Sequence, residues 1–307
     1  MACWSFAISA PEALSFSHPG DPERLESGIQ HIREIETGKL PASVRDAIRY
    51  TLEGGGKRLR GQLVMSAYRA AGGTGNVSTI AAAVEVVHSY SLVHDDLPCM
   101  DDDDMRRGRL STHRAFDVQT ATAAGAAMIP IAAHAAHRGA RELQLPAGAC
   151  CTIVKVLMQA AGAGGMIGGQ HLDLAAEGGA LKREELDAIH SAKTGALISA
   201  SVQLGGLAAN AEPARLRALD RYGKSIGLAF QIMDDVLDVT ASSDQLGKTA
   251  GRDAKLGKST YPALLGVTGA RERAGQLVAD GVGALREHKM LTGELDRLAG
   301  FIISRSH

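Results

Sequence analysis

Cysteine and aromatic residues are scarce in this sequence of 307 residues. The four cysteines, Cys3, Cys99, Cys150 and Cys151, form no CxxC pair, and the two adjacent ones do not readily bridge each other. This pattern excludes a disulfide scaffold and a zinc framework, and it is typical of a reducing compartment. We therefore expect a cytoplasmic protein. Aromatic residues make up only 4% of the chain, which argues against a protein that stacks nucleic acid bases.

The sequence also has no excess of positive or negative charge. The 33 Lys and Arg residues oppose 34 Asp and Glu residues, so the net charge is -1. We expect no nucleic acid partner, and any charged ligand must be recognised by local clusters. No uninterrupted apolar run reaches the roughly 18 residues of a membrane span, so none is expected. The first residues lack the basic region of a signal peptide, and residues 1–20 are interpreted as a flexible N-terminal leader.

From residue 21 onward the sequence pattern is helical. Apolar residues cover most faces of the segment 79–94, as in a buried helix, and alanine-rich blocks recur at 121–136 and 197–209. Glycine and proline separate such blocks at helix-length intervals. The glycine-rich stretch 162–169 is not a nucleotide-binding loop, because no strand precedes it and no GK[ST] follows; we expect close helix packing or ligand approach there. The pattern predicts an all-α fold with one helical domain over residues 21–307.

The first chemical signal is a run of six aspartates between residues 95 and 104, followed by Arg106 and Arg107. Carboxylates this dense repel one another unless a cation or solvent intervenes. A solvated acidic turn is the ordinary alternative, but this run follows directly on an apolar helix. Oxygen ligands of this kind suit Mg²⁺. Pro98 allows the helix to end or bend, so that Asp95 and Asp101 could face one ion.

The second signal is the triplet Asp234, Asp235 and Asp238 within FQIMDDVLDV. Spacings of three and four residues place these carboxylates on one face of a helix. The surrounding residues are apolar, so the carboxylates need a cation. Two acidic helix segments that face each other would form a clamp for a metal and a diphosphate.

A clamp for an anion also needs basic groups. The segment GGGKRLRGQL places Lys57, Arg58 and Arg60 directly after three glycines. Lys57 and Arg60 would project from one side of a starting helix, and the glycines would leave the backbone open to an anion. A plain basic helix end is the alternative. Further donors at Lys193 and Lys248 favour a negatively charged substrate bridged by Mg²⁺.

On these motifs the sequence resembles the trans-prenyl diphosphate synthases, the family of farnesyl and geranylgeranyl diphosphate synthases. The motifs occur in family order: GGGKRLR at 54–60, HSYSLVHDDLPCMDDDDMRRG at 88–108, GMIGGQHLDL at 165–174, KTG at 193–195 and FQIMDDVLD at 230–238. The resemblance implies the isoprenoid synthase fold, an antiparallel helix bundle around a deep central cavity, usually as a homodimer. It implies isopentenyl diphosphate and an allylic diphosphate as substrates.

The resemblance also implies a role for each matching residue. The metal ligands of about three Mg²⁺ ions would be Asp95, Asp96, Asp101, Asp234, Asp235 and Asp238. The catalytic set would be Asp95, Asp101, Asp234, Lys193 and Arg106. The allylic diphosphate would be held by Arg106, Lys193, Thr194, Gln231, Lys248 and Lys258, and isopentenyl diphosphate by Lys57, Arg60, His88 and Arg107.

Product length is expected to depend on Tyr90 and Ser91, which stand about one helical turn before Asp95. A bulky ring there would block elongation, and in this family an aromatic residue at this position usually accompanies a C15 product. We therefore predict farnesyl diphosphate, made from dimethylallyl or geranyl diphosphate, with farnesyl diphosphate as a further candidate primer. An ordinary core tyrosine is the alternative interpretation of Tyr90.

Three other functions fit parts of the pattern. A geranylgeranyl diphosphate synthase would differ only in its product. A terpene cyclase would have no use for Lys57 and Arg60, and a non-catalytic synthase subunit would have lost aspartates that are intact here. Two positions depart from the family: Leu110 stands where a proline is usual, and Ala126 stands where an aspartate is usual. The change at Ala126 is expected to affect the allylic side of the pocket.

Overall fold

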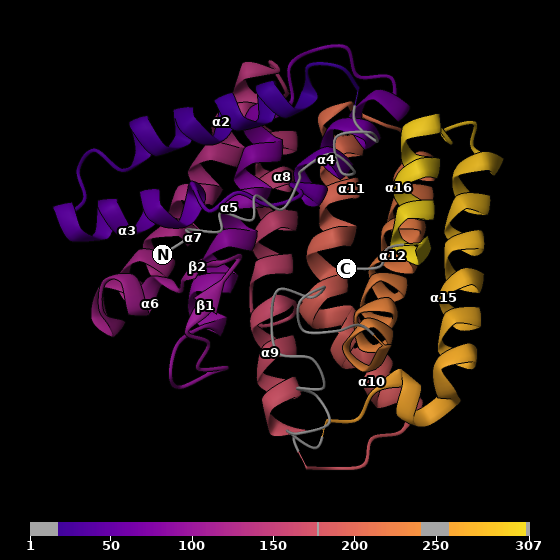
Figure 1. Ribbon diagram of the computed structural model, residues 1–307. Coiled ribbons are helices and arrows are strands. Elements are labelled where there is room, and N and C mark those ends of the chain that lie inside the picture. The colour runs from indigo at the N-terminus through magenta and orange to yellow at the C-terminus, as the bar shows by residue number, and fades with distance from the viewer. Residues whose placement is uncertain (1–17, 177, 241–257, 305–307) are drawn as a thin grey trace, which may run out of the picture.

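The computed structural model describes residues 18–176, 178–240 and 258–304. Its elements follow in the order α2 (Asp21–Glu36), α3 (Ala42–Leu52), α4 (Leu59–Ala70), α5 (Ser78–Asp95), β1 (Met105–Arg106), β2 (Arg109–Leu110), α6 (Thr112–Ala115), α7 (Val118–Glu142), α8 (Ala147–Ala161), α9 (Met166–Ala175), α10 (Arg183–His190), the π-helix η1 (Ser191–Gly195), α11 (Ala196–Ala208), α12 (Pro213–Thr240), α15 (Tyr261–Glu287) and α16 (Gly293–Ser304) (Figure 1). Lys248 and residues 1–17 of the predicted leader lie outside the described residues.

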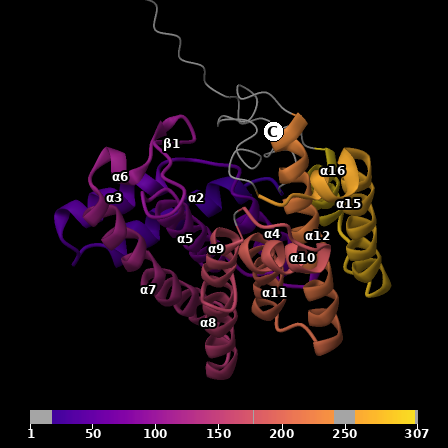
Figure 2. The ribbon, with the colours of Figure 1, turned by 90° about the horizontal axis from the view of Figure 1, so that it is seen from below.

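The helices pack around two apolar cores that meet at α4 and α11. One core gathers buried side chains of α2, α3, α5, α7 and α8, and the other gathers those of α12, α15 and α16. Both α4 and α11 contribute to each core. Figure 1 shows α2 and α3 on one side, α15 and α16 on the other, and α11 between them; Figure 2 shows the same separation from below. The predicted all-helical fold is thus confirmed.

Glycines allow the central helices to approach closely. A Cβ atom on Gly205 of α11 would lie 2.4 Å from the carbonyl oxygen of Val64 in α4. In the predicted glycine-rich contact region, a Cβ atom on Gly169 would lie 2.2 Å from the backbone nitrogen of Lys193. Glycine costs about 1 kcal/mol inside a helix, and here it brings α9 directly against η1.

Between α5 and α6 lies a short β-hairpin, which the helical sequence pattern did not predict. Strands β1 and β2 pair antiparallel, with Met105 opposite Leu110 and Arg106 opposite Arg109. The two turn residues, Arg107 and Gly108, both have positive φ angles, 53° and 73°. This is the backbone combination of the tight turns that suit the twist of a hairpin. The hairpin fixes the two arginines that follow the first aspartate run.

One apolar segment bears on the expectation of no membrane span. Ala147–Ala175, which covers α8 and α9, is long and apolar enough to cross a bilayer, and 39% of its most apolar window is buried inside the protein. Core helices of soluble proteins meet the same criterion. The expectation therefore stays a prediction.

Candidate active site

The first aspartate run folds back over the end of α5. The helix ends at Asp95, before Pro98, and the amide of Asp101 donates to the carbonyl of Asp95 at 2.8 Å. Burial raises the pKa of Asp95 to about 6; Lys193 opposes the rise, and the charge of Asp101 adds to it. The structure therefore places the two predicted metal ligands and a predicted allylic lysine within one electrostatic neighbourhood.

Arg106 of the hairpin is ion-paired with the buried carboxylate of Asp96. Its Nε donates to Asp96 at 3.0 Å, and its Nη2 donates to Asp96 and, at 3.1 Å, to Asp103. Burial raises the pKa of Asp96, and the Arg106 guanidinium opposes that rise. These bonds use Nε and Nη2 of the guanidinium and none of them uses Nη1, so Arg106 can pair with Asp96 and still offer a donor to a ligand.

Arg107 lies across the glycine loop that precedes α4. Its guanidinium donates to the carbonyl of Gly55, and a Cβ atom on Gly56, where φ is 124°, would lie 2.6 Å from it. Only glycine suits both the conformation and the space at this position. The loop thus brings Arg107 of the second motif against the glycines that precede Lys57 in the first.

The three basic residues of this loop differ in their surroundings. The sequence had suggested that Lys57 and Arg60 project from one side of a starting helix. Helix α4 begins at Leu59, however, so Lys57 precedes the helix and does not share its first turn with Arg60. The side chain of Arg58 donates to Glu26 at 2.7 Å and to the carbonyl of Leu52 at 2.9 Å. Arg58 therefore ties α4 to α2 and α3, whereas Arg60 and Lys57 remain the candidates for a substrate.

His88 lies within this basic cluster. Burial lowers its pKa well below the usual value, and Arg60 and Arg107 lower it further. A neutral imidazole can donate one hydrogen bond to an anion without adding to the repulsion among the arginines. Three of the four residues predicted to bind isopentenyl diphosphate are thus electrostatic neighbours.

The second aspartate triplet presents its members in different ways. Asp234 is half-buried, and its charge raises the pKa of Arg60 against burial. Asp235 is 2% exposed and accepts hydrogen bonds from His190 at 3.0 Å and from the amide of Tyr261 at 3.0 Å. Asp235 thus ties α12 to α10 and α15, while Asp234 faces the side on which Arg60 lies.

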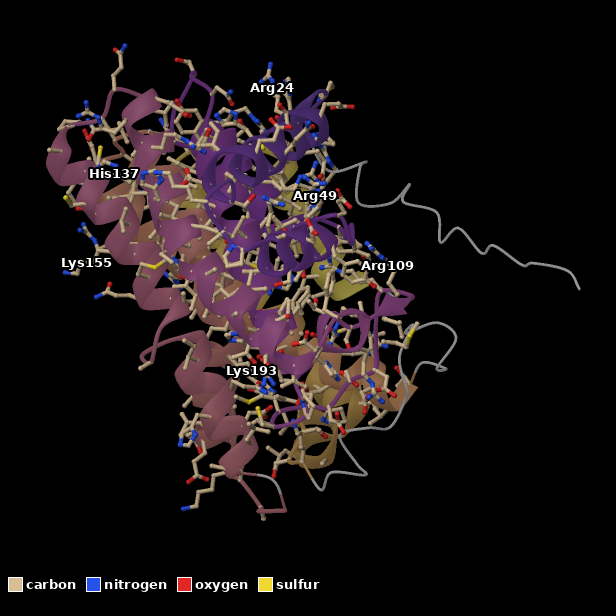
Figure 3. The ribbon with its side chains drawn as sticks, turned by 90° about the vertical axis from the view of Figure 1, so that its left-hand side faces the viewer. Arg24, Arg49, Arg109, His137, Lys155 and Lys193 are labelled. Carbon is tan, nitrogen blue, oxygen red and sulfur yellow. The ribbon has the colours of Figure 1, made fainter. Side chains whose placement is uncertain are left out.

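Two of the three predicted allylic lysines meet on one carboxylate for which the sequence predicted no role. Asp173 of α9 accepts from Lys193 at 2.7 Å and from Lys258 at 2.9 Å, and these lysines help to lower its pKa against burial. Figure 3 shows Lys193 among other side chains near the middle of the molecule, whereas Lys155 projects from its edge. The neighbouring Thr194 donates to Gln231, which was also predicted to hold the allylic diphosphate, at 2.7 Å.

Local backbone geometry places Lys193 there. It lies in η1, a five-residue π-helix between α10 and α11. A π-helical turn is rare and is frequent at functional sites. The extra residue in the turn changes the direction of the Lys193 and Thr194 side chains relative to a regular helix.

Tyr90 is a buried residue of α5, five positions before Asp95. The ring is 1% exposed, and its hydroxyl donates to the carbonyl of Ala161, at the end of α8, at 2.8 Å. Its edge meets the ring of His94, with 5.8 Å between the centroids. The adjacent Ser91 is also buried, and its hydroxyl donates to the carbonyl of His88 at 2.8 Å.

The two departures from the family pattern lie near these residues, Leu110 in the hairpin of Arg106 and Arg107 and Ala126 in α7. Leu110 is 49% exposed, and its carbonyl accepts from Tyr50 at 2.8 Å. Ala126 is exposed on α7, and its neighbour Gly125 packs against His94, where a Cβ atom would lie 2.2 Å from Nε2.

Three further residues at the site had weak signals in the sequence. Asp173 lies within the GMIGGQHLDL motif, Glu85 is a single charge within an apolar helix, and His190 lies three residues before Lys193 of the KTG segment. A charge on an otherwise buried helix is a sign of a paired or functional group.

The donor set fits Mg²⁺ bound together with a diphosphate. Among residues 18–176, 178–240 and 258–304, no three His, Cys, Asp or Glu side chains are gathered closely enough to hold a metal by themselves. Mg²⁺ usually takes one or two carboxylates and completes its shell with water and substrate phosphates. Repelling carboxylates at Asp95 and Asp101 suit that mode of binding.

Acidic segments at two helices, beside a basic loop and a lysine-bearing π-helix in an all-helical bundle, define an isoprenoid synthase. The polyprenyl synthetase family model matches residues 41–289, and the chain belongs to that family.

Individual relatives agree over nearly the whole chain. The sequence is 44% identical to farnesyl diphosphate synthase of Escherichia coli over 296 residues, 93% of this chain and 99% of that one. The fold is similar to geranylgeranyl pyrophosphate synthetase of Pyrococcus horikoshii, with a TM-score of 0.83, 28% identity, and coverage of 95% and 98%. It is also similar to a Helicobacter pylori geranyltransferase complexed with magnesium and isoprenyl diphosphate, with a TM-score of 0.79, 29% identity, and coverage of 96% and 97%.

Proposed function

We propose that this protein is a Mg²⁺-dependent short-chain prenyltransferase that condenses isopentenyl diphosphate with an allylic diphosphate and releases farnesyl diphosphate. The observation that carries the proposal is that basic side chains surround both the first aspartate run and His88. The charges of Lys193 and Arg106 act on Asp95, and those of Arg60 and Arg107 act on His88.

Two diphosphates would occupy these two basic groups. Arg106, Lys193, Thr194, Gln231 and Lys258 would hold the allylic diphosphate, and Lys248, outside the described residues, is proposed for the same role. Lys57, Arg60, His88 and Arg107 would hold isopentenyl diphosphate. About three Mg²⁺ ions would be held by Asp95, Asp101 and Asp234, with Asp96, Asp235 and Asp238 in support.

Charge stabilisation is the chemistry of the site. Bound Mg²⁺ would supply a Lewis acid that neutralises the leaving diphosphate. The lysines and arginines add fixed positive charge there, so the allylic C–O bond breaks and leaves a carbocation. The double bond of isopentenyl diphosphate attacks that cation, a carbon–carbon bond forms, and a proton is lost to the departed diphosphate. Apolar helix walls exclude the water that would otherwise quench the cation.

The C15 product is proposed from the position of Tyr90. Its buried ring, tied to the end of α8, would close the space into which a longer chain must grow. Relatives with farnesyl and with geranylgeranyl names both occur, so family membership does not choose the length.

The test is incubation with labelled isopentenyl diphosphate, Mg²⁺ and each of the C5, C10 and C15 primers, followed by chromatography. We expect elongation of the C5 and C10 primers to C15, and none after chelation of the metal. Failure to elongate any primer would refute the enzyme proposal, and a C20 main product would refute the assignment of Tyr90.

The assembly is proposed to be a homodimer in the cytoplasm, with residues 21–307 as one domain after a leader at 1–20. Light scattering of the purified protein would test the dimer, and a monomer at working concentration would contradict it.

A further inference from the structure

Glu85 is a buried carboxylate inside the apolar helix α5. Its side chain is 2% exposed, and its helix neighbours Val84, Val86 and Val87 are fully buried. An ionised carboxylate in such a place is costly unless hydrogen bonds and a nearby positive charge compensate it. The function proposed above gives Glu85 no role.

The hydrogen bond of Glu85 goes to the beginning of another helix. Its Oε1 accepts from the amide of Gly61 at 2.8 Å. Gly61 lies in the first turn of α4, where amides have no partner within the helix. The Ncap residue of α4, Arg58, makes no side-chain cap. Glu85 therefore caps α4 from α5, and its charge complements the positive end of the helix dipole.

The close approach depends on the glycine. A Cβ atom on Gly61 would lie 3.3 Å from Cγ of Glu85 and 2.6 Å from the side chain of Leu25. A larger residue would push α4 away from the carboxylate. The register of the loop and of the first turn of α4 is thus set against Glu85.

The charge of Glu85 acts on two of the arginines proposed to bind isopentenyl diphosphate, Arg60 and Arg107. Burial lowers the pKa of Arg60 and of Arg107, and in each case Glu85 is the largest influence that raises it again. Arg60 follows Leu59 on the capped turn, and its Nε is buried without a hydrogen-bond partner among the described residues. The guanidinium is held by charge and packing and keeps donors for a ligand.

We propose that Glu85 is a positioning residue for the isopentenyl diphosphate site. By capping the first turn of α4 and balancing the charge of Arg60 and Arg107, it holds the arginines in the binding arrangement before substrate arrives. It does not touch the substrate, because a carboxylate would repel a diphosphate. This inference rests on the proposed function, since it assigns Glu85 to one of the two substrate sites.

Two variants separate the two contributions. Glu85→Gln keeps an oxygen that can accept from Gly61 and removes the charge, while Glu85→Ala removes both. The control is Thr79→Val, at the other end of α5. It removes the hydrogen bond that the Thr79 hydroxyl donates to Glu142 at 2.7 Å. All three are compared for melting temperature, for the KM of each substrate, and for the Kd of isopentenyl diphosphate without primer.

We expect a selective effect on one substrate. Glu85→Ala should raise the KM and Kd for isopentenyl diphosphate about tenfold or more, as loss of an orienting partner usually does. Glu85→Gln should give a smaller rise, and the KM of the allylic substrate should change less than twofold in both. Thr79→Val should lower the melting temperature without changing either KM.

The outcomes distinguish this inference from the function on which it rests. If the unaltered protein elongates primers and Glu85→Gln binds isopentenyl diphosphate with the parent Kd, Glu85 is not a positioning residue. Equal increases in both KM values would also overturn it and indicate a general structural role. If the unaltered protein binds isopentenyl diphosphate but elongates no primer, the proposed function fails. If Glu85→Ala does not fold, Glu85→Gln alone decides.

Discussion

At the scale of single residues, Tyr90 is the residue whose role is most open to a direct test. Tyr90→Ala should give a main product longer than C15, because removal of the ring opens space beyond the chain end. The melting temperature should also fall, since loss of a large buried ring costs about 3–5 kcal/mol. Chromatography of the products is the measurement.

The matched control for that change is Tyr90→Phe. It keeps the ring and removes only the bond to Ala161, so the product should stay at C15. A longer product from Tyr90→Phe would mean that the hydroxyl, rather than the bulk of the ring, limits the chain.

Asp95 should cost stability when no ligand is present. Its pKa is raised from 3.8 to about 6, mainly by burial, so between these values the folded state binds more protons than the unfolded state. Stability from this group therefore falls as pH rises through that window. Asp95→Asn should raise the melting temperature of the ligand-free protein at pH 7.5, with little difference at pH 4, while it abolishes elongation.

The control is Asp104→Asn. Asp104 is exposed, and a hydrogen bond from Arg114 lowers its pKa, so the sign of its contribution is opposite. Asp104→Asn should not raise the melting temperature at pH 7.5. A lower melting temperature for Asp95→Asn at that pH would contradict the assignment of a desolvation cost to Asp95.

At the scale of elements, Phe301 of α16 contacts Lys57, which follows the glycine loop that precedes α4. The Nζ atom of Lys57 lies 5.2 Å from the centroid of the Phe301 ring, a cation–π contact worth about 0.5–1 kcal/mol at exposed sites. Phe301→Leu should therefore raise the KM for isopentenyl diphosphate about twofold to fivefold and leave the allylic KM unchanged. Steady-state kinetics with each substrate varied in turn is the measurement.

Phe301→Tyr serves as the control, because it keeps an aromatic face for Lys57. A parent KM for Phe301→Leu would show that the contact does not hold Lys57 for binding.

The hairpin and the π-helix position the basic side chains of the site. The β1–β2 turn needs positive φ at Arg107 and Gly108, and it delivers Arg106 to Asp96 and Arg107 to the glycine loop. The π-helix η1 delivers Lys193 to Asp173. Each element is a local departure from the regular helix, and each carries side chains assigned to a diphosphate.

At the scale of the whole molecule, ligands should bind together rather than singly. Mg²⁺ with inorganic pyrophosphate should raise the melting temperature by several degrees, because anything that binds only the folded state stabilises it by mass action. Either ligand alone should have a smaller effect, since the carboxylates repel the anion and the arginines repel the cation. Thermal unfolding with each ligand and with both is the measurement.

Asp234→Asn should reduce the combined shift, and Lys224→Gln, which breaks only a surface pair with Asp220, should not. A shift that is the same with pyrophosphate alone as with the mixture would contradict a shared metal–diphosphate site.

The helical fold and the class of chemistry could be predicted from the sequence. Apolar periodicity indicated helices, the spacing of Asp234 and Asp238 indicated one face, and the order of the motifs indicated the family, which the comparisons confirm. The hairpin could not be predicted in this way, because two strands of two residues leave no alternating pattern. The start of α4 was also placed too early, because the positive φ of Arg58 is not visible in its residue type.

Residue types and local spacing determined what this protein can do. Hard carboxylates suit magnesium, and arginines and lysines suit diphosphates, wherever the chain places them. Tertiary structure alone decided which of these charges neutralise one another. Asp96 is ion-paired with Arg106, and Asp173 is ion-paired with Lys258, which lies 85 residues away in the chain. The physical reason is that Coulomb and hydrogen-bond energies depend on distance through space and on burial, and neither is set by sequence separation.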